Sequence, residues 1–274
     1  EIETLDNDAE GRILLESLSE KLRPDTALVT CLHVNNETGA IMPLEEIRDE
    51  IKKLGNGCLF HTDAVQAAGK IPLKISYNGI DSAAFSSHKI CGPRGIGILY
   101  LKDPIEPFLR GGGQEKGIRS GTENLFGITA FSKCLERYFI SEKNKITFDS
   151  YLSQKETTNE FIDNLNSING CTLIPPSRIE NKDLFSPYVV QAAFNKIPGN
   201  VMLRALDAKG FYISTGSACS TKKKSRPVLE AMHIDSDLRE NSVRLSFGPT
   251  TTSKEIDNLF IEIENVNNTF NRMS

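Results

Sequence analysis

A lysine with potential phosphate-binding neighbours stands out first. It is Lys89, the last residue of the segment Ser86-Ser87-His88-Lys89. A lysine that forms a Schiff base must present an unprotonated amine, and burial beside a cation lowers its pKa toward that state. Ser86 and His88 can bind a phosphate group next to it. Taken alone, the segment is more typical of a strand-end lysine that reaches solvent.

A carboxylate and an amide lie in a second segment, His61-Thr62-Asp63-Ala64-Val65-Gln66. The segment comes at the end of a predicted strand, and in open α/β sheets ligands bind at the carboxyl ends of the strands. There Asp63 can hold a protonated ring nitrogen and Gln66 can donate to a ring oxygen. The alternative is a strand-to-helix turn in which Asp63 is simply the helix N-cap.

One of the six cysteines differs from the others in its surroundings. Cys219 lies in a stretch of small polar residues, 214–221, whereas the other five have apolar neighbours typical of the core of a reduced, cytosolic protein. The basic run 222–226 can favour the Cys219 thiolate. An ordinary buried cysteine beside a solvated basic loop remains the alternative. No CxxC pair occurs, so neither a zinc ribbon nor a thioredoxin-like motif is indicated.

Two glycine-rich segments do not match nucleotide-binding motifs. Residues 92–97 lack the GxGxxG spacing and precede a strand, and Gly111-Gly112-Gly113 lacks the ending of a P-loop. In contrast, Arg119-Ser120-Gly121-Thr122 directly precedes a helical pattern. Thr122 can therefore help the helix N-terminus to hold a phosphate, or it can be a simple N-cap.

The elements that must position these residues follow an α/β pattern in the first half of the chain. Apolar runs predict strands at residues 27–34, 58–63, 82–86 and 95–101. Between the first two strands, Pro43 opens a helix that Gly55 ends. This alternation predicts a mainly parallel sheet that is covered on both faces.

The second half has a different character. A long helical region is predicted from residue 122 to residue 168, followed by strands at 171–174, 189–194, 211–214 and 242–247. Helices are predicted at 200–209 and over the C-terminal residues, where apolar side chains from 256 to 266 share one face. We therefore expect two domains: a large α/β domain over residues 1–143, and a smaller α+β domain over 144–274 that carries Cys219.

Composition limits the classes of function. The net charge of −4 and the pI near 5.7 imply no general attraction to nucleic acid or to an anionic membrane. The apolar runs are too short to span a bilayer, no secretory signal is visible, and we expect a cytoplasmic protein. The chain begins with Glu1 in a strand-like stretch, which suggests that an N-terminal portion is missing.

Taken together, the segments resemble the cysteine desulfurases of the class V aminotransferase family, whose architecture is fold type I of the enzymes that use pyridoxal 5'-phosphate (PLP). Each match is modest, but the conjunction is specific. The matching segments occur in family order over essentially the whole chain, at residues 33–39, 61–66, 86–97, 111–115, 119–124, 217–219 and 243–246.

The resemblance implies a role for each candidate residue. Lys89, Cys219 and His88 would be catalytic, with Lys89 holding PLP as a Schiff base and Cys219 receiving sulfur. The implied cofactor-binding residues are Asp63 at the pyridine nitrogen, Gln66 at the ring oxygen, Ser86, His88, Lys89 and Thr122 around the phosphate and aldehyde, and Asn36. Asn36 and Arg244 would bind the substrate carboxylate. The resemblance implies no metal.

The implied reaction converts L-cysteine to L-alanine and leaves a persulfide on Cys219 for iron–sulfur cluster or thio-cofactor assembly. The implied partners are a second copy of the chain, which would contribute Thr122, and a sulfur acceptor or scaffold protein, which the basic run 222–226 can dock. Alternatives are a selenocysteine lyase and an inactive fragment that serves as a binding module. Because the family normally begins well upstream, we expect a fragment or a protein completed by another polypeptide.

Overall fold

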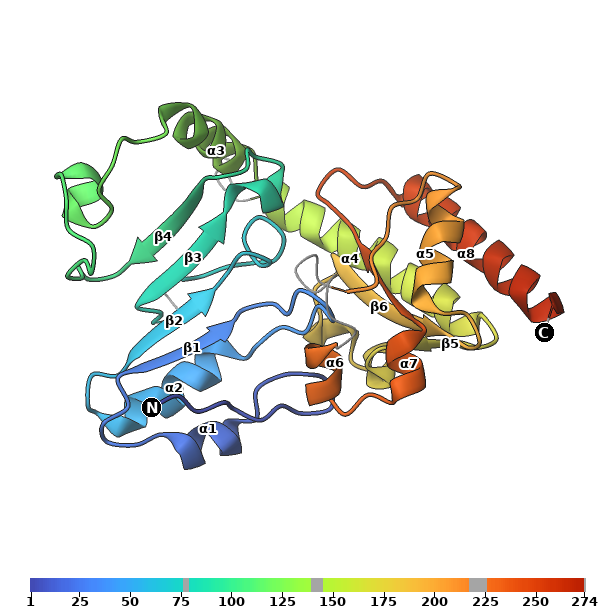
Figure 1. Cartoon of the computed structure of the whole chain (residues 1–274), viewed down its shortest axis with the longest axis horizontal. Helices are drawn as coiled ribbons and strands as arrows, with labels where there is room; N and C mark the ends of the chain where they lie inside the picture. The colour runs from blue at the N-terminus through green and yellow to red at the C-terminus, as the bar shows by residue number, and fades with distance from the viewer. Residues whose placement is uncertain (76–78, 139–144, 217–225, 274) are drawn as a thin grey trace. The chain divides into compact units, whose positions relative to one another are not determined.

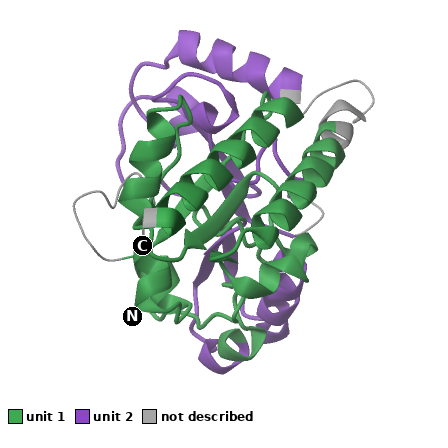
Figure 2. Cartoon of the chain, turned by 90° about the vertical axis from the view of Figure 1, so that its right-hand side faces the viewer, with its two compact units in different colours: residues 1–18, 34–42, 149–274 green, residues 19–33, 43–148 purple. Residues whose placement is uncertain are grey.

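The computed structural model describes residues 1–75, 79–138, 145–216 and 226–273. The chain forms two compact units (Figure 2). Unit 1 comprises residues 1–18, 34–42 and 149–274, and unit 2 comprises residues 19–33 and 43–148. Unit 1 thus includes two early segments of the chain, and the division into domains at residue 143 stays a prediction.

Unit 2 contains a four-stranded sheet in the order β1-β2-β3-β4 (Figure 1). The first three strands are parallel, and β4 runs antiparallel to β3. Only residues 87–96 connect β3 to β4, which is too short for a parallel crossover. The strands are β1 (Leu28–Leu32), β2 (Leu59–Asp63), β3 (Ser82–Ser86) and β4 (Gly97–Leu101).

Unit 2 contains two whole α-helices and two 3₁₀ helices among its described residues, and local residues explain the bounds of the first of these α-helices. In α2 (Leu44–Leu54), Leu44, Ile47 and Ile51 form the buried face, and Gly55 ends the helix in the left-handed conformation with φ 63°. The other helical segments are α3 (Leu125–Tyr138) and the short 3₁₀ helices η1 (Ser87–Ile90) and η2 (Gln114–Gly117). Helix α1 (Leu15–Lys21) belongs partly to each unit.

The two faces of the four-stranded sheet differ in burial. Val29, Phe60 and Ala83 lie on one face and are almost fully buried. On the other face, Leu28 and Leu59 pair with each other in register and are 53% and 50% exposed. The expectation that both faces are covered is therefore wrong for the described part of the chain. The apolar runs predicted burial, but nothing in their pattern shows whether a covering element is present.

Unit 1 is built on a three-stranded antiparallel sheet in the order β5-β6-β7. The central strand β6 is buried at every position, and the rings of Phe161 and Phe247 meet edge to face at 5.6 Å in the core. The strands are β5 (Cys171–Leu173), β6 (Val189–Phe194) and β7 (Ser242–Ser246). The helices are α4 (Lys145–Ser167), η3 (Pro176–Ile179), η4 (Lys182–Leu184), α5 (Gly199–Asp207), α6 (Pro227–Ala231), α7 (Ser236–Glu240) and α8 (Ser253–Met273). Residues 145–148 of α4 belong to unit 2.

One predicted element of the second half needs correction. Residues 211–214 do not form a strand; only Ser214 makes an isolated bridge, to Arg244. The helical region predicted over 122–168 is described as α3 and α4, and residues 139–144 between them lie outside the described part. Among the described helices, none is both long enough and apolar enough to cross a membrane.

Candidate active site

Asp63 is the last residue of β2, at the carboxyl end of the parallel part of the sheet. Its Oδ1 accepts a hydrogen bond from the backbone N–H of Val65 at 2.9 Å, so the side chain does close the turn that follows. The backbone carbonyl of Asp63 accepts from the N–H of His33 at 2.9 Å. Within the described residues no hydrogen bond is made by Oδ2, which leaves that oxygen able to bind a ring N–H.

The segment that carries Lys89 begins at the carboxyl end of the neighbouring strand. Ser86 ends β3, and the 3₁₀ helix η1 that follows contains both His88 and Lys89. The Ser86 hydroxyl and the His88 Nδ1 are 2.7 Å apart. Burial, followed by the positive charges of Lys89, Arg94 and Lys70, lowers the pKa of His88. A lowered pKa favours the neutral imidazole at neutral pH, with one nitrogen as donor and the other as acceptor.

Gly92 allows the Lys89 turn to close tightly. Its N–H donates to the carbonyl of Ser87 at 3.0 Å. A Cβ at position 92 would lie 2.0 Å from the hydroxyl oxygen of Ser87, whose side chain is fully buried. Only glycine fits here without displacing Ser87, and Lys89 lies between these two residues.

Gln66 lies on a helical turn directly after β2. The turn buries Ala64, Ala67 and Ala68, and its Gln66 side chain is half-buried. The Oε1 of Gln66 accepts a hydrogen bond from the Nζ of Lys70 at 3.0 Å. Lys70 was not singled out from the sequence, although the spacing of four residues between a Gln and a Lys on one turn is the signal that could have found it.

Asn36 and Arg244, the predicted carboxylate-binding residues, both belong to unit 1. One guanidinium nitrogen of Arg244 donates to the backbone carbonyl of Asn36 at 3.0 Å. Burial lowers the pKa of Arg244, while the negative charge of Glu37 acts in the opposite direction. Glu37 is itself buried, and its carboxylate lies 3.9 Å from a guanidinium nitrogen of Arg226. The two arginines therefore share one buried acidic neighbour.

A fully buried arginine holds the segment that carries Asn36. Arg178 donates to the carbonyl of Thr38 at 2.8 Å and to that of Ser186 at 3.1 Å, and its guanidinium lies 4.8 Å from the ring centre of Phe185. Sequence reasoning missed this residue because its partner Thr38 is 140 positions away. No local pattern could have indicated it.

The predicted site residues fall into four groups. Asp63, Gln66, Ser86, His88 and Lys89 gather at the carboxyl ends of β2 and β3 in unit 2, and Asn36 and Arg244 meet in unit 1. Thr122 is exposed, just before α3, and within the described residues it makes no hydrogen bond to either group. Cys219 lies outside the described residues, as do positions 222–225 of the basic run.

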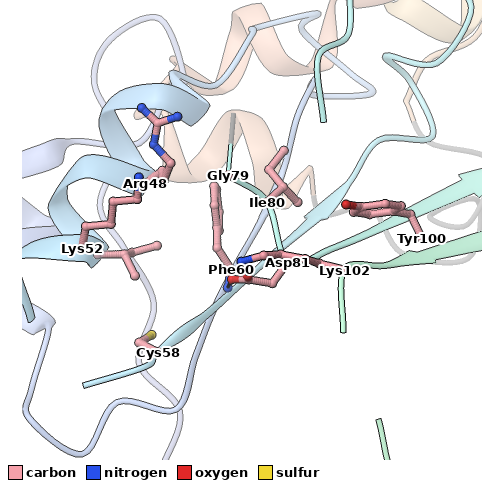
Figure 3. A pocket seen from close by; sticks show the side chains of 10 residues that line it. Arg48, Lys52, Cys58, Phe60, Gly79, Ile80, Asp81, Tyr100 and Lys102 are labelled. Carbon is pink, nitrogen blue, oxygen red and sulfur yellow. Dashed lines mark hydrogen bonds and ion pairs between the residues drawn. The ribbon is translucent and has the colours of Figure 1, made fainter. Parts of the chain in front are cut away.

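A pocket of about 420 Å³ lies at the opposite end of the same strands (Figure 3). Cys58 directly precedes β2, and Phe60 is near the start of that strand. Asp81 directly precedes β3, and Arg48 lines the pocket from α2. The Asp81 carboxylate accepts from the backbone N–H of Phe60 at 2.9 Å and pairs with Lys102 at 3.3 Å. None of the predicted site residues lines this pocket. Within the described residues, no group of three or more His, Cys, Asp or Glu side chains is placed to hold a metal ion.

The chain belongs to the aminotransferase class-V family, whose model matches residues 1–259. Several of the relatives that it matches are cysteine desulfurases. A NifS/IcsS protein homolog of Lactobacillus delbrueckii subsp. bulgaricus is 37% identical over 271 residues, which are 97% of this chain and 68% of the relative. A cysteine desulfurase IscS of Dictyoglomus turgidum is 33% identical over 277 residues, which are 94% of this chain and 63% of the relative.

Solved structures agree with this assignment. A NifS-like protein superimposes with a TM-score of 0.82 at 30% identity, covering 97% of this chain and 68% of that one. A NifS-like protein from Rickettsia africae gives a TM-score of 0.76 at 26% identity. The predicted resemblance to cysteine desulfurases and the predicted fold type are thereby confirmed. The chain spans about two thirds of the length of these relatives.

The donor set in unit 2 fits PLP, the cofactor on which this family depends in general. A carboxylate suits a protonated pyridine nitrogen, and an amide suits the ring oxygen. A hydroxyl paired with an imidazole suits a phosphate, and the lysine amine suits the aldehyde. These groups follow two adjacent parallel strands, where the fold class binds its ligands.

Proposed function

We propose that the chain provides the active-site residues for PLP-dependent removal of sulfur from L-cysteine, with L-alanine as the other product. The observation that carries the proposal is the group formed by Asp63, Gln66, Ser86, His88 and Lys89 at the ends of β2 and β3 in a member of the class-V family. Because the chain spans about two thirds of its relatives, its activity as a separate polypeptide is part of the proposal.

The residues of unit 2 would hold the cofactor. When bound, PLP supplies an electron sink for the charge that develops at the substrate Cα. Asp63, through Oδ2, would keep the pyridine nitrogen protonated, which strengthens that sink. Ser86 and His88 would bind the phosphate together with Thr122, which the second subunit of a homodimer would contribute. Lys89 would carry the cofactor through its Nζ.

The residues of unit 1 would hold the substrate. Arg244 presents planar, bidentate donors that suit a carboxylate, and its contact with the Asn36 carbonyl limits the orientations of its guanidinium. Glu37 stabilises the charged form of this half-buried arginine. Once released from the cofactor, the Lys89 amine would remove the Cα proton and later return a proton to the product.

Cys219 would accept the sulfur. Its thiolate would form a bond to the substrate sulfur while the carbon–sulfur bond breaks, and that bond's electron pair would remain with the carbon, which is then protonated to give alanine. The product on the protein is a persulfide, available to a sulfur acceptor or an iron–sulfur scaffold. A selenocysteine lyase would use the same PLP residues and differ in its choice of chalcogen.

The first experiment is borohydride reduction of the purified chain incubated with PLP, followed by denatured intact mass and peptide mapping. We expect one pyridoxyl-phosphate adduct, on Lys89. Lys89→Ala should lose the adduct, whereas the exposed-site control Lys102→Ala should keep it. An adduct that maps elsewhere would refute the assignment of Lys89.

If the chain binds PLP, turnover of L-cysteine and of selenocysteine then distinguishes the desulfurase, the lyase and the binding module. Release of alanine from L-cysteine supports the desulfurase, and Cys219→Ser should then lose both alanine release and the persulfide. Release from selenocysteine alone supports the lyase. Bound PLP with neither activity would favour a non-catalytic binding module.

A further inference from the structure

Lys70 is a buried cation that the proposed mechanism does not use. Its exposed fraction is only 8%, and lysines are rarely so buried unless they are paired. Its Nζ donates to the Oε1 of Gln66, four residues earlier on the same turn, at 3.0 Å. The turn is held by backbone hydrogen bonds, among them Ala68 N–H to the Ala64 carbonyl at 2.9 Å and Lys70 N–H to the Ala67 carbonyl at 3.1 Å.

The chemistry of this pair determines which way the Gln66 amide faces. An ammonium group has donors and no acceptor, so it can bind only the oxygen of the amide and never the NH₂ group. With Oε1 held by Lys70, the NH₂ group is the end that Gln66 offers to any other partner. A hydroxyl or a second amide in place of Lys70 could accept as well as donate, and would leave the orientation open.

The position of Lys70 connects it to the candidate active site. Its positive charge contributes to lowering the pKa of His88, the residue that precedes Lys89. Gln66 follows Asp63 by three residues at the same edge of the sheet. Lys70 can therefore orient the amide through the Gln66 Oε1 without being one of the residues proposed to hold the cofactor.

We propose that Lys70 is a positioning residue that fixes the Gln66 amide as a hydrogen-bond donor to the ring oxygen of PLP. The inference rests on the proposed function. The reversed amide would direct its carbonyl at the anionic ring oxygen, which repels it. Lys70 thus acts on cofactor affinity and on the protonation of bound PLP through its hydrogen bond to Gln66.

The test is a double-mutant cycle read by PLP titration of the purified chain. Lys70→Met keeps the length of the side chain and removes the donor, and should raise the dissociation constant of PLP about tenfold. In a Gln66→Ala background the same change should have an effect of less than about twofold, because no amide remains to be oriented. Lys70→Arg keeps a donor and should recover most of the affinity, and Lys74→Met, at an exposed site, should match the unchanged protein.

A spectroscopic readout accompanies the titration. A donor to the ring oxygen stabilises its deprotonated form, so Lys70→Met should move the pH-dependent change in the visible band of bound PLP to higher pH. Equal effects of Lys70→Met in both backgrounds, or no effect in either, would overturn the inference and leave the proposed function intact. Failure of the unchanged chain to bind PLP would overturn the proposed function and the inference with it.

Discussion

His33 makes the stability of the protein depend on pH. Only 6% of its surface is exposed, and burial lowers its pKa from 6.5 to about 4. Within the described residues its Nδ1 has no hydrogen-bond partner, so no group compensates a charge there. Between these two pKa values the unfolded chain binds a proton that the folded chain does not, and stability therefore falls as the pH falls through this range.

The size of this effect follows from the two pKa values. Integrating the difference in bound protons from about pH 7.5 down to about pH 5 gives a loss of about 2 kcal/mol in the free energy of unfolding. Lowering the pH further, to the folded pKa of about 4, brings the loss to about 3 kcal/mol. Other groups also titrate in this range, so the part due to His33 must be isolated by mutation.

The contribution of His33 is measured by urea denaturation at about pH 7.5 and about pH 5, followed by circular dichroism. His33→Gln cannot be protonated, so its loss between about pH 7.5 and about pH 5 should be smaller by about 2 kcal/mol than that of the unchanged protein. The control is His233→Asn, at an exposed position with φ 54° that asparagine tolerates, and its pH dependence should be unchanged. Equal pH dependence in His33→Gln and the unchanged protein would refute the argument.

Three further predictions concern the candidate site. Arg178→Met leaves two buried carbonyls without their donor and should reduce the free energy of unfolding by about 3 kcal/mol in urea titrations; a loss below about 1 kcal/mol would contradict this account of the residue. Gly92→Ala should cost about 1–3 kcal/mol by the same assay, because its Cβ would collide with the Ser87 hydroxyl. Adding Ser87→Ala should recover part of that loss. If nothing is recovered, the loss comes from the backbone at position 92 and not from the Ser87 hydroxyl. In a chain that turns over cysteine, Arg244→Lys should raise KM about tenfold with little change in kcat, since lysine cannot bind a carboxylate bidentately; an unchanged KM would exclude Arg244 from the substrate site.

Local patterns predicted several elements to the residue. Strands β3 and β6 have the bounds expected for them, and α2 ends at Gly55, because apolar runs and a left-handed glycine act on the neighbouring backbone alone. The strand expected at 211–214 is absent because a strand needs a hydrogen-bonded partner along its whole length. Here only Ser214 is paired, and periodicity cannot reveal the number of pairs that tertiary packing allows.

The sequence by itself determined which side chains are candidates for chemistry and that they lie at the ends of strands. Asp63 and Lys89 could be assigned to strand ends because each comes a few residues after an apolar run, 58–60 for Asp63 and 83–85 for Lys89. The conjunction of short motifs was specific enough to indicate the family. Tertiary structure alone decided what supports these residues. It formed the hydrogen bond between Lys70 and Gln66 across one helical turn. It also brought Arg178 into contact with Thr38, which lies far from it in the chain. Such contacts depend on where a buried donor meets an acceptor in space, and a separation of 140 positions leaves no pattern in the sequence to record it.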